Sequence, residues 1–197
     1  MKTWMTFLML VALAGCHRVN TGETEDEAAY QQTPKGFEWQ PLAEIKGACL
    51  KPTGWYFSKV LKKDYIVYRL TREKVSADNQ FLTGLSIHAC QHVPQVKGMS
   101  PSQMAANQLR EYARDKQVIE EYAPRQVGAM IQSGGTYQRE MTLMGQRQSF
   151  TIHMTMLAND STGTLYIMVY GCPENQWGKF LNTISTIGSD ISLDPTI

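Results

Sequence analysis

The chain has 197 residues, of which 19 are Lys or Arg and 18 are Asp or Glu, so its formal net charge is +1 at pH 7. This near neutrality argues against a nucleic-acid partner, which needs a basic face. It also argues against binding to acidic lipid headgroups through a polybasic segment. The length suffices for one domain of ordinary size with a real hydrophobic core.

The first fifteen residues have the layout of a secretory signal peptide. Lys2 gives a positive start, and a short apolar run ending in small residues follows it. A membrane-spanning helix needs about 20 apolar residues, so this run is too short to cross comfortably. The run leads into Leu13-Ala14-Gly15-Cys16, which resembles the bacterial lipobox. We therefore predict a signal peptide over residues 1–15.

The resemblance to the lipobox implies that the Cys16 thiol carries a diacylglyceryl group and that the signal is cut just before it. Each buried methylene contributes about 0.8 kcal/mol, and more than one acyl chain, such as palmitate, makes attachment stable. We expect a periplasmic-side, lipid-anchored protein, and His17 in place of Asp favours the outer membrane over the inner one. The alternatives are a soluble secreted protein with a cysteine after its cleavage site, or an uncleaved anchor.

Residues 16–35 are expected to be the lipidated cysteine and a flexible acidic tether. Residues 17–34 have almost no large apolar side chains, so they cannot bury enough surface to offset their ordering entropy. A coil of about 18 residues spans about 25 Å on average. The tether would lift a domain, expected over residues 36–192, off the membrane.

Three strands are predicted in the first half of this domain. Residues 55–61 and 65–71 are rich in aromatic and β-branched residues, and residues 62–64 form the turn between them. The sequence Pro52-Thr53-Gly54-Trp55 marks a turn before the first of these strands. Residues 82–93 form the third predicted strand.

A helix is predicted to begin at Ser100. Ser100 can cap the helix, Pro101 suits the first helical position, and Gln103 completes a capping box. Apolar residues then recur at helical spacing, which predicts a helix to about Lys116.

The second half predicts further strands and a final helix. Residues 129–133 and 136–143 flank Gly134-Gly135, which indicates a hairpin or a bulged strand. Residues 149–157 alternate in polarity, whereas residues 165–170 are apolar on both faces, as in a central covered strand. Pro173 opens the last predicted helix, which has an apolar stripe and can end at Gly188.

The predicted order is strands, helix, strands, helix, without βαβ alternation. This order predicts an α+β fold, with a mainly antiparallel sheet and helices packed on it.

Three stretches resemble the PsbP-like superfamily. They are residues 37–55 with their Pro-x-Gly-Trp turn, residues 81–87 followed by residues 99–102, and residues 159–177. Together they extend over residues 37–188, nearly the whole domain. The resemblance implies an antiparallel sheet sandwiched by helices, and a role in binding and assembly rather than catalysis. The superfamily includes extrinsic photosystem proteins, a nuclear Ran-binding relative and DcrB-like bacterial envelope lipoproteins; the acidic tether argues against a photosynthetic role.

Three cysteines remain when Cys16 is lipidated, namely Cys49, Cys90 and Cys172. The predicted compartment permits disulfides, so we expect one bridge and one spare thiol. The sequence leaves all three pairings open. It also leaves open the alternative that all three cysteines stay as thiols.

The sequence His88-Ala89-Cys90-Gln91-His92 indicates a candidate zinc or copper site. On a strand His88, Cys90 and His92 would share one face, and their side chains suit either metal. Alternate strand residues lie about 6.6 Å apart, so His153 or Cys172 from elsewhere would have to contribute. The alternative is that the histidines are ordinary polar residues and that Cys90 lies in a disulfide or in the core. No other cofactor is predicted.

Catalytic motifs find little support, so no enzyme activity is expected. Ser100 lies two residues after Gly98, but the second glycine of a nucleophile elbow is missing at position 102. Gly134-Gly135 lacks the flanking pattern of a phosphate-binding loop. The pair Glu120-Glu121 is expected on a solvated surface. Of the eleven methionines, Met154 and Met156 alternate as core residues do, although a soft copper site or an adaptable binding surface is the other interpretation.

These observations favour a membrane-anchored, non-catalytic domain that docks onto an envelope protein complex whose identity the sequence does not give. The alternative is a metal-handling or hydrolytic envelope protein that uses His88, Cys90 and His92. A purely structural lipoprotein is a third reading.

Overall fold

A computed structural model describes residues 33–143 and 145–194 of the chain. The predicted signal peptide and most of the predicted tether lie outside these residues. Within the described ranges, no helix combines the length and the apolar character needed to cross a membrane.

The described chain contains nine strands, three α-helices and two short 3₁₀-helices. In order they are β1 (Phe37–Leu42), η1 (Ala43–Ile45), β2 (Gly47–Pro52), β3 (Tyr56–Leu61), β4 (Tyr65–Thr71), β5 (Gly84–Cys90), α1 (Val93–Lys97), α2 (Pro101–Ala113), β6 (Gln117–Val127), β7 (Met130–Leu143), β8 (Gln146–Asn159), β9 (Thr164–Pro173), η2 (Glu174–Gln176) and α3 (Trp177–Ser189).

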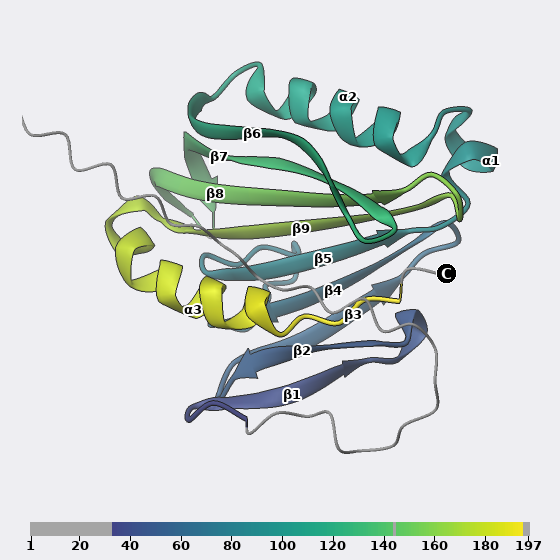
Figure 1. Ribbon diagram of the computed structural model, residues 1–197. Helices are drawn as coiled ribbons and strands as arrows, with labels where there is room; N and C mark the ends of the chain where they lie inside the picture. Colours follow the sequence, from purple (N-terminus) through teal and green to yellow (C-terminus); the bar gives the residue numbers. More distant parts are fainter. Residues whose placement is uncertain (1–32, 144, 195–197) are drawn as a thin grey trace, which may run out of the picture.

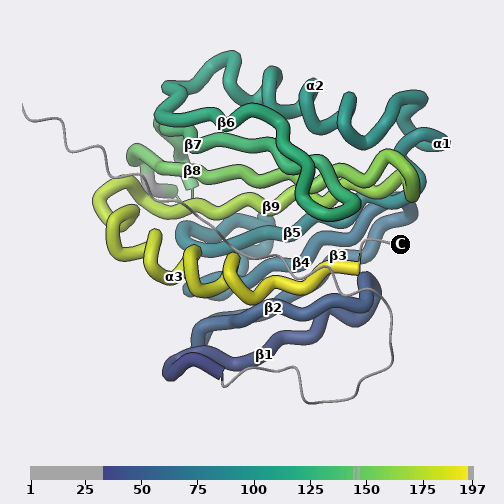
Figure 2. Tube along the Cα trace, in the orientation of Figure 1, coloured from purple at the N-terminus to yellow at the C-terminus, as the bar shows by residue number. Residues whose placement is uncertain are grey.

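The strands form a two-stranded and a seven-stranded sheet. β1 pairs with β2, and the larger sheet has the order β3-β4-β5-β9-β8-β7-β6 with antiparallel neighbours throughout. The two central strands β5 and β9 lie side by side although they are far apart in the sequence (Figure 2). The predicted fold class, a mainly antiparallel sheet flanked by helices, is confirmed.

The seven-stranded sheet buries side chains on both faces. Along β9 the odd and even positions point to opposite faces, so Tyr166 and Tyr170 join one hydrophobic cluster while Leu165 and Ile167 join the other. The front face, defined as the one that carries Tyr166 and Tyr170, packs against α3 and the β1–β2 hairpin. The back face packs against α2 (Figure 1). The apolar run over residues 165–170 is therefore a covered central strand, as predicted.

α2 begins at the predicted capping box. The Ser100 hydroxyl accepts a hydrogen bond from the Gln103 backbone N–H at 3.3 Å, and the Gln103 side chain accepts one from the Ser100 N–H at 3.1 Å. Two helix-terminal N–H groups are thereby satisfied, which fixes where the helix starts. The helix ends at Ala113, three residues before the predicted end.

The turn before β3 has the predicted position. The Trp55 N–H donates to the Pro52 carbonyl at 3.0 Å, and Gly54 at the third position has a φ of 82°. A type II turn requires a positive φ there, which glycine adopts without strain.

The prediction of a hairpin or a bulged strand at Gly134-Gly135 is wrong, because β7 runs through both glycines in unbroken register with β8. The irregularities lie instead in the neighbouring strand β6, between Val118 and Glu120 and between Tyr122 and Arg125. A Cβ atom at Gly134 would collide with the Tyr122 hydroxyl. The glycine therefore makes room for a ring that folds over the strand.

Several strand boundaries also differ from the prediction. β6 and the β1–β2 hairpin were not predicted as strands; β6 is largely exposed and polar, and only its pairing with β7 reveals it. β5 ends at Cys90, so Val93 belongs to α1 rather than to a strand. Pro173 ends β9, and the last helix starts at Trp177.

Candidate binding surfaces

The predicted lipidation site Cys16 lies outside the described residues. The other predicted site residues all lie within them, on or next to β2, β5 and β9.

His88, Cys90 and His92 do not share one strand face in the structure. His88 and Cys90 point to the back face of β5, but His92 lies beyond the strand end, with a φ of 54° where the chain turns into α1. The three side chains therefore do not share the strand face on which the prediction depended. Among residues 33–143 and 145–194, no three His, Cys, Asp or Glu side chains gather closely enough to hold a metal ion.

His88 and Cys90 are not an activated thiol–imidazole pair either. Burial raises the pKa of the Cys90 thiol, and burial together with the nearby Arg69 lowers the pKa of His88. Both groups are therefore held in their neutral forms, whereas a reactive cysteine needs its thiolate. The only hydrogen bond of His88 in the described chain joins its Nε2 to the Ser86 hydroxyl, at 3.2 Å.

The cysteines of the domain are free thiols, so the predicted disulfide is not found in the structure. Cys90 pairs with Leu165 near the start of β9, while Cys172 lies seven residues further along that strand. At about 3.3 Å per residue this separates them by about 23 Å, far beyond the reach of a bridge. Cys49 belongs to the front-face core, on the opposite side of the sheet from Cys90.

Cys49 and Cys172 both lie in the front-face core, and burial raises the pKa of each thiol to about 12. The alternative that all three cysteines stay as thiols describes the structure.

The expectation that Met154 and Met156 pack in the core is also confirmed, since both are buried against α2.

One half of the back face has no helix over it in the described chain. α2 packs on β7, β8 and β9, whereas β3, β4 and β5 carry a set of exposed or half-buried side chains on the same face. We call this set the open patch; it comprises Tyr56, Ser58, Val60, Tyr65, Arg69, His88 and Cys90. Tyr56 and Tyr65 are 49% and 41% exposed.

The open patch is cationic. The ten back-face side chains of β3, β4 and β5 include Arg69 but no Asp or Glu. Lys97 of α1 lies close enough to Cys90 to act on its pKa, and Lys62 and Lys63 are exposed in the β3–β4 turn. The patch therefore combines tyrosines and aliphatic groups with a surround in which Lys62, Lys63 and Lys97 outnumber Asp64 of the same β3–β4 turn.

The other half of the back face contains a cavity of about 260 Å³. We call it the back-face cavity. Its walls come from the loop before β5, from α2 and from four strands; the lining residues are Asn79, Gln80, Phe81, Leu82, Ser86, Tyr112, Arg139, Met141, Leu143, Phe150, Ile152, Val169 and Gly171. Arg139 is the one charged residue among them.

A half-buried histidine that the sequence did not single out as a site of its own lies on the front face of β8. The Thr136 and Thr155 hydroxyls contact the two ring nitrogens of His153 at 2.9 and 3.2 Å, and the Tyr122 and Tyr170 rings pack beside it. Burial lowers the pKa of His153 to about 4, so the ring is neutral at pH 7. No carboxylate of the described chain bonds to it, so the arrangement lacks the orienting acid of a catalytic triad.

Comparisons with known proteins give solved structures of low similarity only. No protein-family model matches the chain, and no curated protein matches it. The solution structure of cyanobacterial PsbP from Synechocystis sp. PCC 6803 is 11% identical, with 88% of this chain and 98% of that chain covered and a TM-score of 0.48. The Ran-binding protein Mog1p of Saccharomyces cerevisiae is 12% identical, with coverages of 80% and 95% and a TM-score of 0.46.

The described part of the chain is thus an α+β domain whose antiparallel sheet is covered by different elements on its two faces. Its surface features are an open patch and a cavity on the same face.

Proposed function

We propose that this chain is a lipid-anchored envelope lipoprotein whose non-catalytic domain binds another envelope protein through the open patch and helps to assemble its complex. The observation that carries the proposal is the unequal covering of the back face. Three strands there present exposed aromatic and cationic side chains where the described chain supplies no covering helix.

The composition of the open patch suits protein recognition. Tyrosine and arginine are enriched at protein interfaces, because an aromatic ring buries a large area and a guanidinium offers several hydrogen bonds. Tyr56 and Tyr65 supply such rings on adjacent strands, and Arg69 lies on the same face. A partner would bury side chains that are now in water.

Charge complementarity defines the chemistry of the partner. The patch itself has no carboxylate, and three flanking lysines (Lys62, Lys63 and Lys97) outnumber Asp64 of the β3–β4 turn. The partner surface should therefore be acidic with apolar side chains at its centre. Such pairing increases the association rate at low salt and weakens as salt rises.

The lipid anchor supports the same proposal from the sequence. The lipobox-like residues 13–16 and the acidic segment that follows them would hold the domain near a membrane, on the periplasmic side. Anchoring restricts the search for a partner to the membrane surface, which raises the effective concentration of both proteins.

Site-specific photo-crosslinking tests the docking proposal. A photoreactive amino acid replaces Tyr65 in one variant and Leu181 of α3 in the other; these residues are 41% and 46% exposed, so they are matched in accessibility. In the native envelope we expect the variant at position 65 to give one discrete adduct that weakens in high salt, and the variant at position 181 to give none. Equal adducts from both positions, or none from position 65, would contradict the proposal.

Mass spectrometry of the native protein tests the anchor separately. The peptide that begins at Cys16 should carry the mass of a diacylglyceryl group and a further acyl chain. An unmodified peptide that spans Gly15 and Cys16 would exclude the anchor while leaving the crosslinking result to decide the docking surface.

A further inference from the structure

We propose that the back-face cavity binds a single-chain carboxylate amphiphile, with its acyl chain in the cavity and its carboxylate on Arg139. This goes beyond the docking function, because it assigns a ligand to a different part of the same sheet face.

The lining of the cavity is amphiphilic. Seven of the lining residues have large apolar side chains, among them Phe81, Met141 and Phe150, and none of the described lining residues is Asp or Glu. An apolar cavity with a single cationic wall fits a ligand that has one anionic end and an apolar remainder.

The guanidinium of Arg139 lacks a partner within the described chain. Its Nε atom is buried and makes no hydrogen bond, and Arg139 forms no salt bridge with any described carboxylate. Leaving a charged donor buried and unpaired is costly, whereas a carboxylate can accept two parallel hydrogen bonds from one guanidinium. The guanidinium of Arg139 is thus available to bind an anion in the cavity.

A second cation lies beside the cavity without lining it. Lys116, three residues after the end of α2, lies 3.7 Å above the ring of Tyr112, which lines the cavity, and its Nζ donates to the Tyr112 carbonyl. Burial and the positive charge of Arg139 lower the pKa of Lys116, so the two cations lie close enough to repel each other. Asp115 acts on Lys116 in the opposite direction, but Lys116 makes no described salt bridge. An anion between the cations would relieve their repulsion.

The volume limits the size of the ligand. If each non-hydrogen group takes about 30 Å³, the share of a water molecule in the liquid, the 260 Å³ cavity holds about nine groups. This corresponds to one acyl chain of about eight carbons, and a lipid with two long chains would not fit. A peptide is disfavoured because its backbone groups would find few hydrogen-bond partners among the mostly apolar walls.

Photolabelling of the full-length protein on vesicles tests the inference. The probe is an octanoic acid analogue with a diazirine on its chain, and the matched probe is the corresponding alcohol. We expect the acid to label peptides with cavity residues such as Phe81 or Met141, and unlabelled octanoate to compete. Arg139→Gln should reduce this labelling about tenfold, the effect of one lost charge-assisted hydrogen bond.

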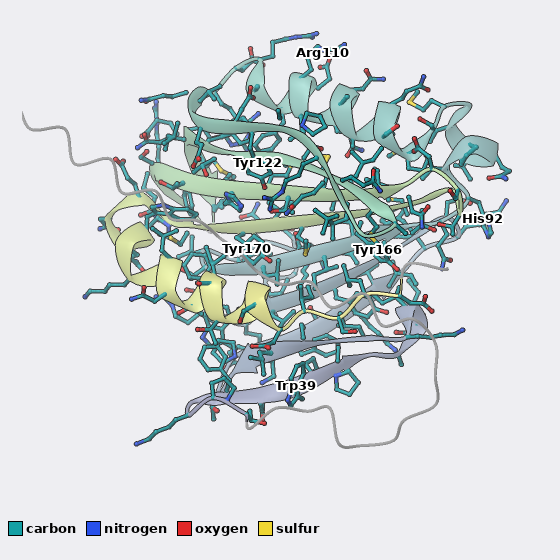
Figure 3. The ribbon with its side chains drawn as sticks, in the orientation of Figure 1. Trp39, His92, Arg110, Tyr122, Tyr166 and Tyr170 are labelled. Carbon is teal, nitrogen blue, oxygen red and sulfur yellow. The ribbon has the colours of Figure 1, made fainter. Side chains whose placement is uncertain are left out.

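Two further variants control the experiment. Arg110→Gln removes an exposed arginine of α2 that points away from the sheet (Figure 3), and it should leave the labelling unchanged. Gly171→Leu fills the cavity with Arg139 in place; a Cβ atom at Gly171 makes only ordinary contacts, the shortest 3.6 Å to the Ile152 side chain, so the fold should tolerate it. It should abolish the labelling even if Arg139→Gln folds poorly.

Equal labelling by the acid and the alcohol, adducts outside the cavity walls, or full labelling of the folded Gly171→Leu variant would each overturn the inference. The docking proposal is untouched by any of these results, because none of the residues that define the open patch lines the cavity.

Discussion

The two halves of the back face differ in what covers them and in what they are made of. Under α2, β8 presents a row of apolar side chains that includes Phe150, Ile152, Met154 and Met156, all buried. On the other half, the strands present Tyr, Ser, Arg and His side chains that tolerate water. The comparison suggests that one half of the face stabilises the fold and that the other is available for recognition. The predictions below test this division, from the largest expected effect to the smallest.

The largest effect is expected under α2. Tyr137 of β7 is fully buried, its ring meets the Tyr112 ring edge-on at 5.2 Å, and its hydroxyl donates to Glu121. Tyr137→Ala should lower the free energy of unfolding by about 4 kcal/mol, the usual cost of deleting a buried aromatic ring. Denaturant unfolding measures this, and a loss below about 1 kcal/mol would show that α2 is not packed as described.

A smaller, pH-dependent effect is expected from His153, on the front side of β8. Its folded-state pKa is about 4, below the value of about 6.5 in an unfolded chain, so the unfolded state binds a proton first as pH falls. The stability that His153 contributes is present above pH 6.5 and is lost as pH falls towards 4, by about 3 kcal/mol in total.

Comparison of the wild type with His153→Gln isolates this effect. Acid also protonates carboxylates such as Glu44, whose pKa is lowered to about 2 by hydrogen bonds from Lys59 and Tyr68. The variant should therefore lose less stability than the wild type between pH 7 and pH 4. Parallel pH profiles for the two proteins would rule out a buried neutral imidazole.

The next effect concerns the start of the covering helix. Ser100→Ala removes the acceptor for the Gln103 N–H and should destabilise the protein by about 1 kcal/mol. Ser100→Gly, which keeps the cap conformation accessible, should cost only a few tenths of a kcal/mol. Thermal unfolding of the pair distinguishes them, and equal losses would argue against the capping role.

The smallest effect on stability is expected in the open patch. Tyr65→Ser should change the free energy of unfolding by less than about 0.5 kcal/mol, because the side chain is exposed and Cys90 is its neighbour across the strand pair. The same variant should abolish the crosslinked adduct from a probe at position 56. A large loss of stability would mean that the patch belongs to the core.

Secondary-structure elements that are specified by short stretches of sequence could be predicted. The strand pair β3–β4 and the start of α2 follow from β-rich runs and from a capping box, and both lie where predicted. The apolar alternation in β8 and the two-sided apolar run in β9 likewise gave their burial correctly.

The missed features depend on contacts between distant segments. β6 is polar and exposed, with Ile119 at 53% exposure, so only its pairing with β7 defines it as a strand. Gly134 is required by close contacts with the Met154 carbonyl and with Tyr122, twelve residues earlier, and no local pattern signals those contacts.

The candidate sites show the same limit. The sequence pointed to His88, Cys90 and His92 by spacing, but β5 ends two residues too early for His92 to join the strand face. The back-face cavity is built from a loop, a helix and four strands, so no stretch of the sequence contains its pattern. Arg139 could have been noticed only as a charge on the apolar face of β7, opposite Phe150.

Protection of single introduced thiols tests the division of the back face most directly. Tyr65→Cys and Leu181→Cys place thiols at similarly exposed positions, one in the open patch and one on α3. Their reaction rates with a water-soluble maleimide are compared in the native envelope and after purification. We predict that the thiol at position 65 is protected in the envelope and reactive when purified, while the thiol at position 181 reacts equally in both. Equal reactivity at position 65 in both states would contradict the proposal that this surface is a docking site.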